Sequence, residues 1–573
     1  MRVHGASRAA LAGALAVGTV VVASCGKDAT GTVQAGPAAA IQLVSGDQQS
    51  APVGTELPSP IVVRVVDAQG RPVRGQAVSF RVTSGGGSVY AGAANSNDSG
   101  IARERWTLGT STADSQRVEA RAVDNATGAP LTFAVFRAVA VAGAASRIDV
   151  TPAELRFWLP GDTGRLSAVV KDRYGNVIPN AIVTWRSTDT AVATVDASGR
   201  AVGVHDGRAT VLGAVSPDAE DSTPVSVDRW GVVSLGSWST CGLMVLGELY
   251  CWGDGRFGKL ANGSDGGQQS TPLRVAGGML FRSVSAGEYE TCAVTTDGTA
   301  YCWGYNALGQ LGDGTTTTRL TLARVAGGVP FQIISNQYTH TCGLTPSGVA
   351  YCWGENSSGQ LGDGTTIQRL SPVQVVGGLT FSTISAGTGL TCGISISGGL
   401  YCWGRSFGAS PASILTPLTF SSVYVGSVSA CTVTTSGAGY CWGENAAGQV
   451  GDGTTYNGWS PVPLAVVGGH SFQSITVRDY TACAATTTRT GYCWGDNYYG
   501  EAGNGILAGP ALLEPTPVTG GVPFSSIGTD WQRSCGLASS GDIYCWGSNA
   551  SGDFGDGTTT SSPIPVKTIR PGQ

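Results

Sequence analysis

Fourteen cysteines fall into seven pairs, and nine residues separate the two members of every pair. The pairs are Cys241 with Cys251, Cys292 with Cys302, Cys342 with Cys352, Cys392 with Cys402, Cys431 with Cys441, Cys483 with Cys493, and Cys535 with Cys545. Thiols in this pattern could form disulfide bonds, bind a metal ion or stay free. Zinc would need closer Cys-x-x-Cys pairs or nearby histidines, and the chain has only four histidines. The spacing favours disulfides, with metal binding and free thiols as the alternatives.

Each cysteine pair is predicted to close one β-hairpin. Cys342 and Cys352 flank a turn centred on Ser347. Because side chains alternate along a strand, a separation of ten residues puts both on the same face. Residues opposed at a non-hydrogen-bonded position have Cα atoms about 4.5 Å apart, which is near the short end of the disulfide range. Each bridge would stabilise the fold by slightly under about 3 kcal/mol.

No other residue pattern predicts catalysis. We find no Ser/His/acid spacing, no phosphate-binding Gly-Lys-Ser/Thr and no His-x-x-His. Four aspartates lie in Gly-Asp-Gly-Thr turns, namely Asp313, Asp363, Asp452 and Asp556. Calcium ligation there is conceivable, but each loop offers one carboxylate rather than a cluster, so an Asx turn is favoured. We therefore expect no metal and no cofactor, and the protein is interpreted as a non-enzyme.

The best candidate surface is a three-residue variable loop that precedes the first cysteine of each copy. The seven loops are 237–239, 288–290, 338–340, 388–390, 427–429, 479–481 and 531–533. If the copies form a ring, all seven loops gather on one face. The candidate binding residues in them are Trp238, Tyr289, Tyr338, Tyr480, Trp531 and Arg533. Tyr, Trp and Arg are the usual anchors of intermolecular contacts. The alternative is that these rings only pack against neighbouring copies.

The elements that would position these loops are short strands in a repeat. First cysteines lie 51, 50, 50, 39, 52 and 52 residues apart, and a period near 50 with several strands per copy is typical of a β-propeller. In the third copy we predict strands at 331–334, 341–344, 350–353 and 372–375, with a loop at 359–366. Seven copies predict seven four-stranded blades.

The repeat resembles the regulator-of-chromosome-condensation family. The matching motif is Ile/Val-Ser-Ala-Gly, Cys-Gly-Leu, Tyr-Cys-Trp-Gly-x-Asn and Gly-Gln-Leu-Gly-Asp-Gly-Thr-Thr, over residues 229–570. The resemblance implies a seven-bladed propeller over residues 229–573 but no single activity. Copy four lacks the Gly-Asp-Gly-Thr-Thr loop, which suggests that this loop is solvated. The tryptophans after the second cysteines are expected to pack between blades: Trp252, Trp303, Trp353, Trp403, Trp442, Trp494 and Trp546.

Two cysteine-free segments precede the repeats. Residues 38–143 alternate as strands do, with turns at Asp67–Gly70 and Asn97–Gly100, and resemble the bacterial Ig-like domains of invasin-type adhesins. Residues 145–228 resemble another group of bacterial Ig-like domains. The predicted fold is thus all-β: two Ig-like β-sandwiches followed by a seven-bladed propeller. Three tryptophans, Trp106, Trp158 and Trp185, are predicted core residues.

The first residues read as an export signal. Arg2 and Arg8 precede a short apolar run that ends in Val22-Ala23-Ser24-Cys25, which resembles the bacterial lipobox. The resemblance implies cleavage after residue 24 and lipidation of Cys25. The following residues are small and polar, and we interpret 25–37 as a tether. An ordinary secretory signal is the alternative. The expected location is the bacterial cell envelope, with membrane contact through the lipid only, in the outer membrane or at the cell surface.

Composition narrows the partners. The net charge of −5 gives no broad basic face, which argues against nucleic acid. The favoured function is non-catalytic, adhesion-type binding of a protein or glycan at or beyond the envelope through one propeller face. The alternatives are a secreted lyase or glycosidase acting on polysaccharide and, by family analogy alone, a nucleotide exchange factor.

Overall fold

The computed structural model describes residues 35–275, 277–414 and 417–571. The chain forms two compact units. One contains residues up to Arg147 together with Val169–Ala181, and the other contains Ile148–Ala168 and the chain from Ile182 onward. The predicted signal, Cys25 and most of the tether lie outside the described residues. Within the described ranges, no helix is long and apolar enough to cross a membrane.

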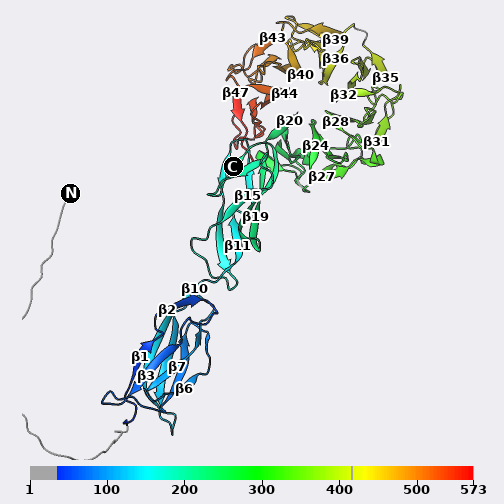
Figure 1. Ribbon diagram of the computed structural model, residues 1–573. Helices are drawn as coiled ribbons and strands as arrows, with labels where there is room; N and C mark the ends of the chain where they lie inside the picture. Colours follow the sequence, from blue (N-terminus) through cyan, green and yellow to red (C-terminus); the bar gives the residue numbers. More distant parts are fainter. Residues whose placement is uncertain (1–34, 276, 415–416, 572–573) are drawn as a thin grey trace, which may run out of the picture. The chain divides into compact units, whose positions relative to one another are not determined.

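Nearly all the regular structure in the described residues is β-strand (Figure 1). Only two single-turn 3-10 helices occur there, η1 (Arg256–Gly258) and η2 (Ala326–Gly328). The predicted all-β class is therefore confirmed.

The first unit contains a three-stranded sheet, β1-β3-β7, a five-stranded sheet, β2-β10-β9-β4-β6, and the pair β5-β8. The bounds are β1 (Ala40–Ser45), β2 (Gln49–Pro52), β3 (Ile61–Val66), β4 (Ala77–Ser84), β5 (Ser88–Val89), β6 (Ala93–Asn95), β7 (Ile101–Glu104), β8 (Trp106–Thr107), β9 (Gln116–Val123) and β10 (Pro130–Val141). Strand β2 runs parallel to β10, and the other pairings described in this unit are antiparallel.

Alternation along the strands builds the core of this unit. In β9, Val118 and Ala120 are buried while the residues between them are more exposed, as expected for a half-buried strand. They share one apolar cluster with Val63 of β3, Phe136 of β10 and the buried Trp106. The two sheets therefore pack face to face around a core that needs no disulfide.

Both turns predicted in the first unit are present. The Gly70 amide donates to the Asp67 carbonyl at 3.0 Å, and the Gly100 amide donates to the Asn97 carbonyl at 2.9 Å. Both glycines have φ above +70°, a conformation that glycine adopts without steric cost. The Asp67 carboxylate also accepts from the Gln69 amide, which makes an Asx turn.

Residues 145–228 hold three further sheets, ordered β11-β14, β12-β19-β18-β15 and β13-β17-β16. The bounds are β11 (Ala145–Thr151), β12 (Leu155–Phe157), β13 (Thr163–Arg165), β14 (Ser167–Asp172), β15 (Thr184–Ser187), β16 (Ala193–Val195), β17 (Arg200–Gly203), β18 (Gly207–Ser216) and β19 (Ala219–Val227). Trp106 is buried, as predicted for a core residue, whereas Trp185 and Trp158 are only half-buried, so the prediction of core residues is wrong for these two. Trp158 packs instead against an apolar cluster that includes Trp230 and Tyr250 of the propeller.

From Trp230 onward the strands form seven four-stranded antiparallel sheets arranged as blades around a ring (Figure 1). Blades 1 to 3 are β20 (Trp230–Gly236), β21 (Ser239–Met244), β22 (Leu249–Asp254), β23 (Gln268–Arg274); β24 (Phe281–Ala286), β25 (Glu290–Thr295), β26 (Ala300–Gly304), β27 (Arg319–Arg324); and β28 (Ile333–Asn336), β29 (His340–Leu344), β30 (Ala350–Gly354), β31 (Arg369–Gln374).

Blades 4 to 7 follow the same order. They are β32 (Phe381–Ala386), β33 (Leu390–Ser395), β34 (Leu400–Gly404), β35 (Gly408–Ser413); β36 (Phe420–Val425), β37 (Ser429–Thr434), β38 (Gly439–Asn445), β39 (Tyr456–Ala465); β40 (Phe472–Arg478), β41 (Thr481–Thr486), β42 (Gly491–Gly495), β43 (Leu512–Pro517); and β44 (Phe524–Thr529), β45 (Arg533–Ala538), β46 (Ile543–Gly547), β47 (Ser562–Lys567). Each blade uses one continuous stretch of chain.

The structure joins every predicted cysteine pair within its own hairpin. In chain order, the disulfide bonds join Cys241 to Cys251, Cys292 to Cys302, Cys342 to Cys352, Cys392 to Cys402, Cys431 to Cys441, Cys483 to Cys493 and Cys535 to Cys545. Cys342 of β29 lies directly opposite Cys352 of β30 in the strand register, and their Cα atoms are 4.1 Å apart. Both residues are fully buried. The bridges thus connect the two middle strands of each blade, as the spacing of the cysteines predicted.

At most of the boundaries between blades, a tryptophan indole donates a hydrogen bond to a loop carbonyl of the preceding blade. The Gln310 carbonyl in the loop of blade 2 accepts hydrogen bonds from the Trp353 indole at 2.9 Å and from the Thr341 hydroxyl at 2.8 Å, both in blade 3. Equivalent indole bonds are made by Trp252, Trp303, Trp494 and Trp546. All seven repeat tryptophans are fully buried, which confirms the predicted packing between blades.

The prediction of a solvated Gly-Asp-Gly-Thr-Thr loop is confirmed for its later residues and wrong for its first glycine. Leu311 and Gly312 are buried against the next blade, and only the following Gly-Thr-Thr segment emerges into solvent. Blade 4 keeps its four strands without this loop, but at the boundary with blade 5 the Trp442 indole N–H finds no partner among the described residues. Phe407 and Trp459, with ring centroids 5.8 Å apart, border the same apolar cluster.

The ring closes between blade 7 and blade 1 by side-chain packing. Phe554 and Ile543 of blade 7 share an apolar cluster with Trp230 and Trp252 of blade 1. The Asp553 carbonyl accepts the Trp252 indole at 2.8 Å, which repeats the contact used between the other blades. The first and last blades therefore meet as ordinary neighbours.

Candidate binding face of the propeller

The variable loops meet around the axis of the ring. The Gln337 side-chain amide of blade 3 donates to the Ser427 hydroxyl of blade 5 at 3.5 Å, although these blades are not neighbours. Arg478 of blade 6 likewise reaches blade 1, donating to the Leu235 carbonyl at 3.0 Å. Such contacts are possible only where the inner ends of the blades converge.

The predicted loop aromatics form two groups and one separate ring. Trp238 and Trp531 lie edge to face, with centroids 5.9 Å apart. Tyr289 and Tyr338 are 5.5 Å apart, and Phe257 extends this second group. Two of the predicted rings are clearly accessible, since Tyr480 is 39% exposed and Trp531 is 45% exposed.

Two cationic side chains of the protein lie over the Trp238 ring. The Arg256 guanidinium carbon lies 5.3 Å from the ring centroid, and the Lys259 ammonium lies 5.7 Å from it. Both distances are in the range of a cation–π interaction. Lys259 is buried and also donates to the Ser237 carbonyl at 2.8 Å. The Trp238 face is therefore engaged within the protein.

Arg533 does not belong to the accessible face, which corrects the prediction. Its guanidinium is buried and donates to the Gly236 carbonyl at 2.8 Å and to the Asp553 carboxylate at 3.1 Å. Arg533 is the first residue of β45, where the side chain points into the boundary with blade 1. The third residue of every loop likewise begins a strand and is buried. These residues are Ser239, Glu290, His340, Leu390, Ser429, Thr481 and Arg533.

Two of these buried third residues have pKa values far from their ordinary ones. Burial raises the pKa of Glu290 to about 8, and one of its oxygens accepts from the Asn336 amide at 3.0 Å. Burial also lowers the pKa of His340 to about 3, and its Nε2 lies 2.8 Å from the Thr391 hydroxyl of blade 4. These side chains hold neighbouring blades together.

A group of carboxylates at the axis was not predicted. Glu288, Asp479 and Asp530 gather around Arg478, and burial raises the pKa of both Glu288 and Asp479. The sequence carries a signal for this cluster. Where other copies have glycine five residues before the first cysteine, three copies have Gln337, Arg478 and Asp530.

The aspartates of the Gly-Asp-Gly-Thr turns use their carboxylates locally. Asp313 accepts from the Thr315 amide at 2.9 Å, from the Asn306 amide at 3.2 Å and from Arg319 at 2.8 Å. These bonds hold the pKa of Asp313 below its ordinary value against the effect of burial. The Asx-turn prediction is confirmed here and at Asp363, Asp452 and Asp556. Within the described ranges, no group of three or more His, Cys, Asp or Glu residues is placed to hold a metal ion.

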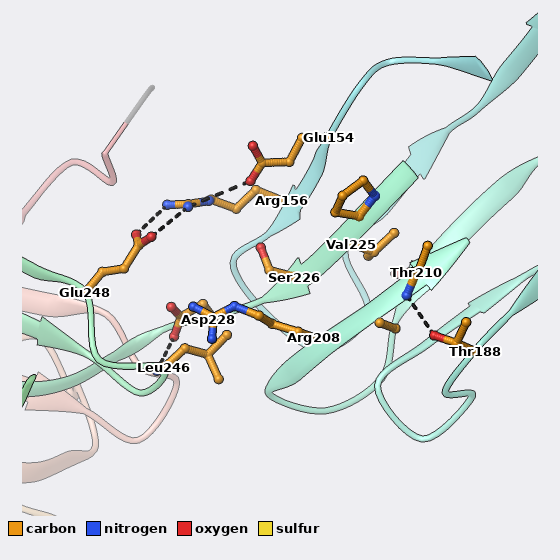
Figure 2. A pocket seen from close by; sticks show the side chains of 12 residues that line it. Glu154, Arg156, Thr188, Arg208, Thr210, Val225, Ser226, Asp228, Leu246 and Glu248 are labelled. Atoms are coloured by element: carbon orange, nitrogen blue, oxygen red, sulfur yellow. Dashed lines mark hydrogen bonds and ion pairs between the residues drawn. The ribbon is translucent and has the colours of Figure 1, made fainter. Parts of the chain in front are cut away.

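A second candidate is a cavity of about 340 Å³, lined by β12, β18, β19 and the turn before β22 (Figure 2). Arg156 pairs with Glu248 at 2.9 Å, and Arg274 pairs with the other oxygen of Glu248 at 2.9 Å. Asp228 accepts from the Leu246 amide at 3.0 Å, and burial raises its pKa to about 6. Most of the charged groups here neutralise one another. The ion pair between Arg156 and Glu248 joins residues 154–228 to blade 1, and we therefore interpret the cavity as part of this junction.

Sequence reasoning missed this second site entirely. Arg156 and Glu248 are separated by 92 residues and belong to no repeated motif. Only the folded chain brings them together.

Comparisons with known proteins address the repeats. The description "Regulator of chromosome condensation (RCC1) repeat" matches residues 247–294, 281–310, 347–394 and 530–553. The chain contains RCC1 repeats. These matches lie in blades 1 to 4 and 7, so the predicted repeat family is confirmed for this part of the chain.

Solved structures agree on the fold. Human WBSCR16 is 16% identical, with a TM-score of 0.51, and the match covers 57% of this chain and 94% of that one. Prp20p from Saccharomyces cerevisiae, studied for its binding to Gsp1p and histones, is 18% identical with a TM-score of 0.50 and coverage of 57% and 87%. The RCC1-like propeller is therefore supported at the level of fold.

Curated relatives share only part of the chain. The human E3 ubiquitin-protein ligase HERC2 is 31% identical over 193 residues, which is 31% of this chain and 4% of the ligase. The ultraviolet-B receptor UVR8 of Arabidopsis thaliana is 28% identical over 123 residues, which is 21% of this chain and 28% of the receptor. The chain thus spans a small part of either relative.

Proposed function

We propose that this protein is an exported, lipid-anchored binding protein of the bacterial cell envelope. Cys25 would carry the lipid, and two Ig-like domains would form a stalk. The lipobox-like Val22–Cys25 and seven paired cysteines support export, because disulfides persist in oxidising compartments. The propeller would bind a protein or glycan through its loop face.

The observation that carries this proposal is the composition of the loop face. Its tyrosines and tryptophans vary from copy to copy while the residues between blades repeat. Tyr480 and Trp531 are well exposed, at 39% and 45%. Exposed aromatic side chains near the centre of a ring are suited to anchoring a partner.

The test is capture of a partner from envelope extract by the full chain. A variant with Tyr480→Ala and Trp531→Ala should lose the captured partner and keep its circular dichroism spectrum. The control variant, Tyr90→Ala with Tyr174→Ala, removes two exposed rings from the first unit and should capture normally. Equal capture by the first variant would remove the binding role of this face.

A second candidate function is an enzyme acting on polysaccharide. The central carboxylates favour it, because Glu288 and Asp479 have raised pKa values, and a carboxyl group with raised pKa can act as an acid near neutral pH. Turnover of an extracellular polysaccharide by the pure protein, abolished by Glu288→Gln, would establish it. No turnover on a panel of such substrates would leave binding as the function.

A further inference from the structure

We propose that the axial end of the loop face binds a cationic side chain, a lysine or arginine of a polypeptide partner, between Glu288 and Asp479. This inference rests on the proposed binding function and specifies the chemistry of the partner. The site comprises Glu288, Tyr289, Gln337, Tyr338, Ser427, Asp479 and Tyr480.

The first argument is buried negative charge without an ion pair. Arg478, the nearest cation, already donates hydrogen bonds to the Leu235 carbonyl and the Ser237 hydroxyl and forms an ion pair with Asp530. Across the described ranges, neither Glu288 nor Asp479 forms an ion pair. Burial is the main cause that raises the pKa of Glu288 and of Asp479. Arg478 lowers both pKa values, and the charges of neighbouring carboxylates raise them by a smaller effect. A cation placed between Glu288 and Asp479 would stabilise both buried carboxylates in their charged form.

The second argument is a surplus of hydrogen-bond acceptors. Gln337 is only 4% exposed, and while its amide nitrogen donates to Ser427, its Oε1 has no partner among the described residues. The neighbouring Asn336 Oδ1 is also buried without a donor among the described residues. A buried acceptor without a donor costs about 1–3 kcal/mol. An ammonium or guanidinium group supplies several donors at once.

The third argument compares two parts of the same face. The Trp238 ring already has Arg256 and Lys259 against it. The rings of Tyr289, Tyr338 and Tyr480 have no cation within that range in the described structure. Tyrosine rings attract cations by about 0.5–2 kcal/mol. The tyrosine side of the face is therefore the part that can accept an external cation.

These features favour a cationic polypeptide over a neutral glycan. A sugar can use tyrosine rings and acceptors, but it does not neutralise carboxylates that repel each other. An anionic partner would add to the repulsion. The carboxylates are thus the residues that discriminate between these partners.

The experiment measures binding of fluorescent hexalysine and hexaarginine peptides to the full chain by anisotropy. Binding should weaken with added salt, as expected for charge attraction, and should fall at least about ten-fold in the double variant Glu288→Gln/Asp479→Asn. A control variant, Asp297→Asn/Glu514→Gln, changes net charge by the same amount at exposed carboxylates elsewhere and should bind normally. A neutral oligosaccharide and hexaglutamate are the comparison ligands.

Two results would overturn the inference. One is equal loss of peptide binding in both double variants, which would mean diffuse attraction. The other is a preference for the neutral oligosaccharide that survives Glu288→Gln/Asp479→Asn. If the carboxylate variant still captures the envelope partner while Tyr480→Ala/Trp531→Ala does not, the binding face stands and only the cationic chemistry fails. If both variants capture it, the proposed function itself fails.

Discussion

Two boundaries between blades differ in one loop. Between blades 2 and 3, the Gln310 carbonyl accepts from both Trp353 and Thr341. Between blades 4 and 5 the loop is absent, the Trp442 N–H is buried without a partner among the described residues, and Ala430 stands in place of the threonine. The tryptophan is kept and the threonine is lost. This difference indicates that the ring of the tryptophan matters for packing even where no loop carbonyl accepts its N–H.

The largest effect is expected from a variant that disrupts the loop contact between blades 2 and 3, where the Gln310 carbonyl accepts both hydrogen bonds. In Gly312→Ala the new Cβ would lie 2.5 Å from the Trp353 indole nitrogen, at a residue with φ of +67°. Overpacking and a left-handed backbone together should cost about 2–4 kcal/mol. The check is the midpoint of chemical unfolding with the disulfides intact. Gly314→Ala, with positive φ but open space around its Cβ, should lose only about 1 kcal/mol. Equal losses would show that the contact with Trp353 is unimportant.

The second prediction compares the two tryptophans directly. Trp353→Phe removes ring volume and a hydrogen bond, and should cost about 2–3 kcal/mol. Trp442→Phe removes the same volume but also eliminates an unpartnered buried N–H, so its loss should be smaller by about 1–2 kcal/mol. Unfolding followed by the remaining tryptophan fluorescence measures both. A larger loss for Trp442→Phe would contradict the comparison.

The third prediction concerns the loop residue itself. Glu501 takes the place of Gln310 and Gln449, burial raises its pKa to about 7, and its Oε1 has no partner among the described residues. Because the folded pKa exceeds the ordinary value near 4.5, the wild type should lose stability as pH rises from about 4.5 through 7. Glu501→Gln should be more stable by about 1–3 kcal/mol at about pH 8, and the difference should vanish near pH 4.5.

The converse variant is the control for this prediction. Gln449→Glu places a carboxyl group at an equivalent buried position and should introduce the same loss at high pH. Unfolding measured from about pH 4.5 to 8 follows both variants. A pH-independent difference between Glu501→Gln and wild type would contradict the titration.

The smallest effect is expected from a variant that restores a missing hydroxyl group. The Gln449 carbonyl accepts the Trp494 indole, but the residue equivalent to Thr341 is Ala482. Ala482→Ser should add a hydrogen bond and raise stability by up to about 1 kcal/mol. Ala430→Ser, at the boundary without the loop, should give no gain, because its hydroxyl finds no loop carbonyl. A gain at residue 430 alone would reverse the comparison.

Much of the fold was predictable because it repeats. Seven cysteine pairs at constant spacing located the hairpins, and the register of Cys342 opposite Cys352 follows from alternation along strands. The predicted first strand of blade 3 was two residues too early, since 331–334 became Ile333–Asn336. Trp106 was correctly predicted as core, while Trp158 and Trp185 are half-buried, because a tryptophan within or beside a strand does not by itself reveal how much of the protein covers it.

The candidate site was predictable only in part. Tyr480 and Trp531 are exposed as expected, but Arg533 is buried because its position begins a strand at the boundary with blade 1. The axial carboxylates were missed because Glu288 and Asp479 lie in separate repeats, and the replacement of glycine by Gln337, Arg478 and Asp530 does not show by itself which side chains meet.

The sequence by itself determined the blade, its disulfide and the number of copies, because hairpins depend on residues about ten positions apart and their periodicity is visible in the chain. Only the tertiary structure decided what lies on the axis and what lies between blades. Closing the ring brings together side chains from blades 2, 3, 5 and 6, and neither their distance nor their burial is encoded in any one repeat.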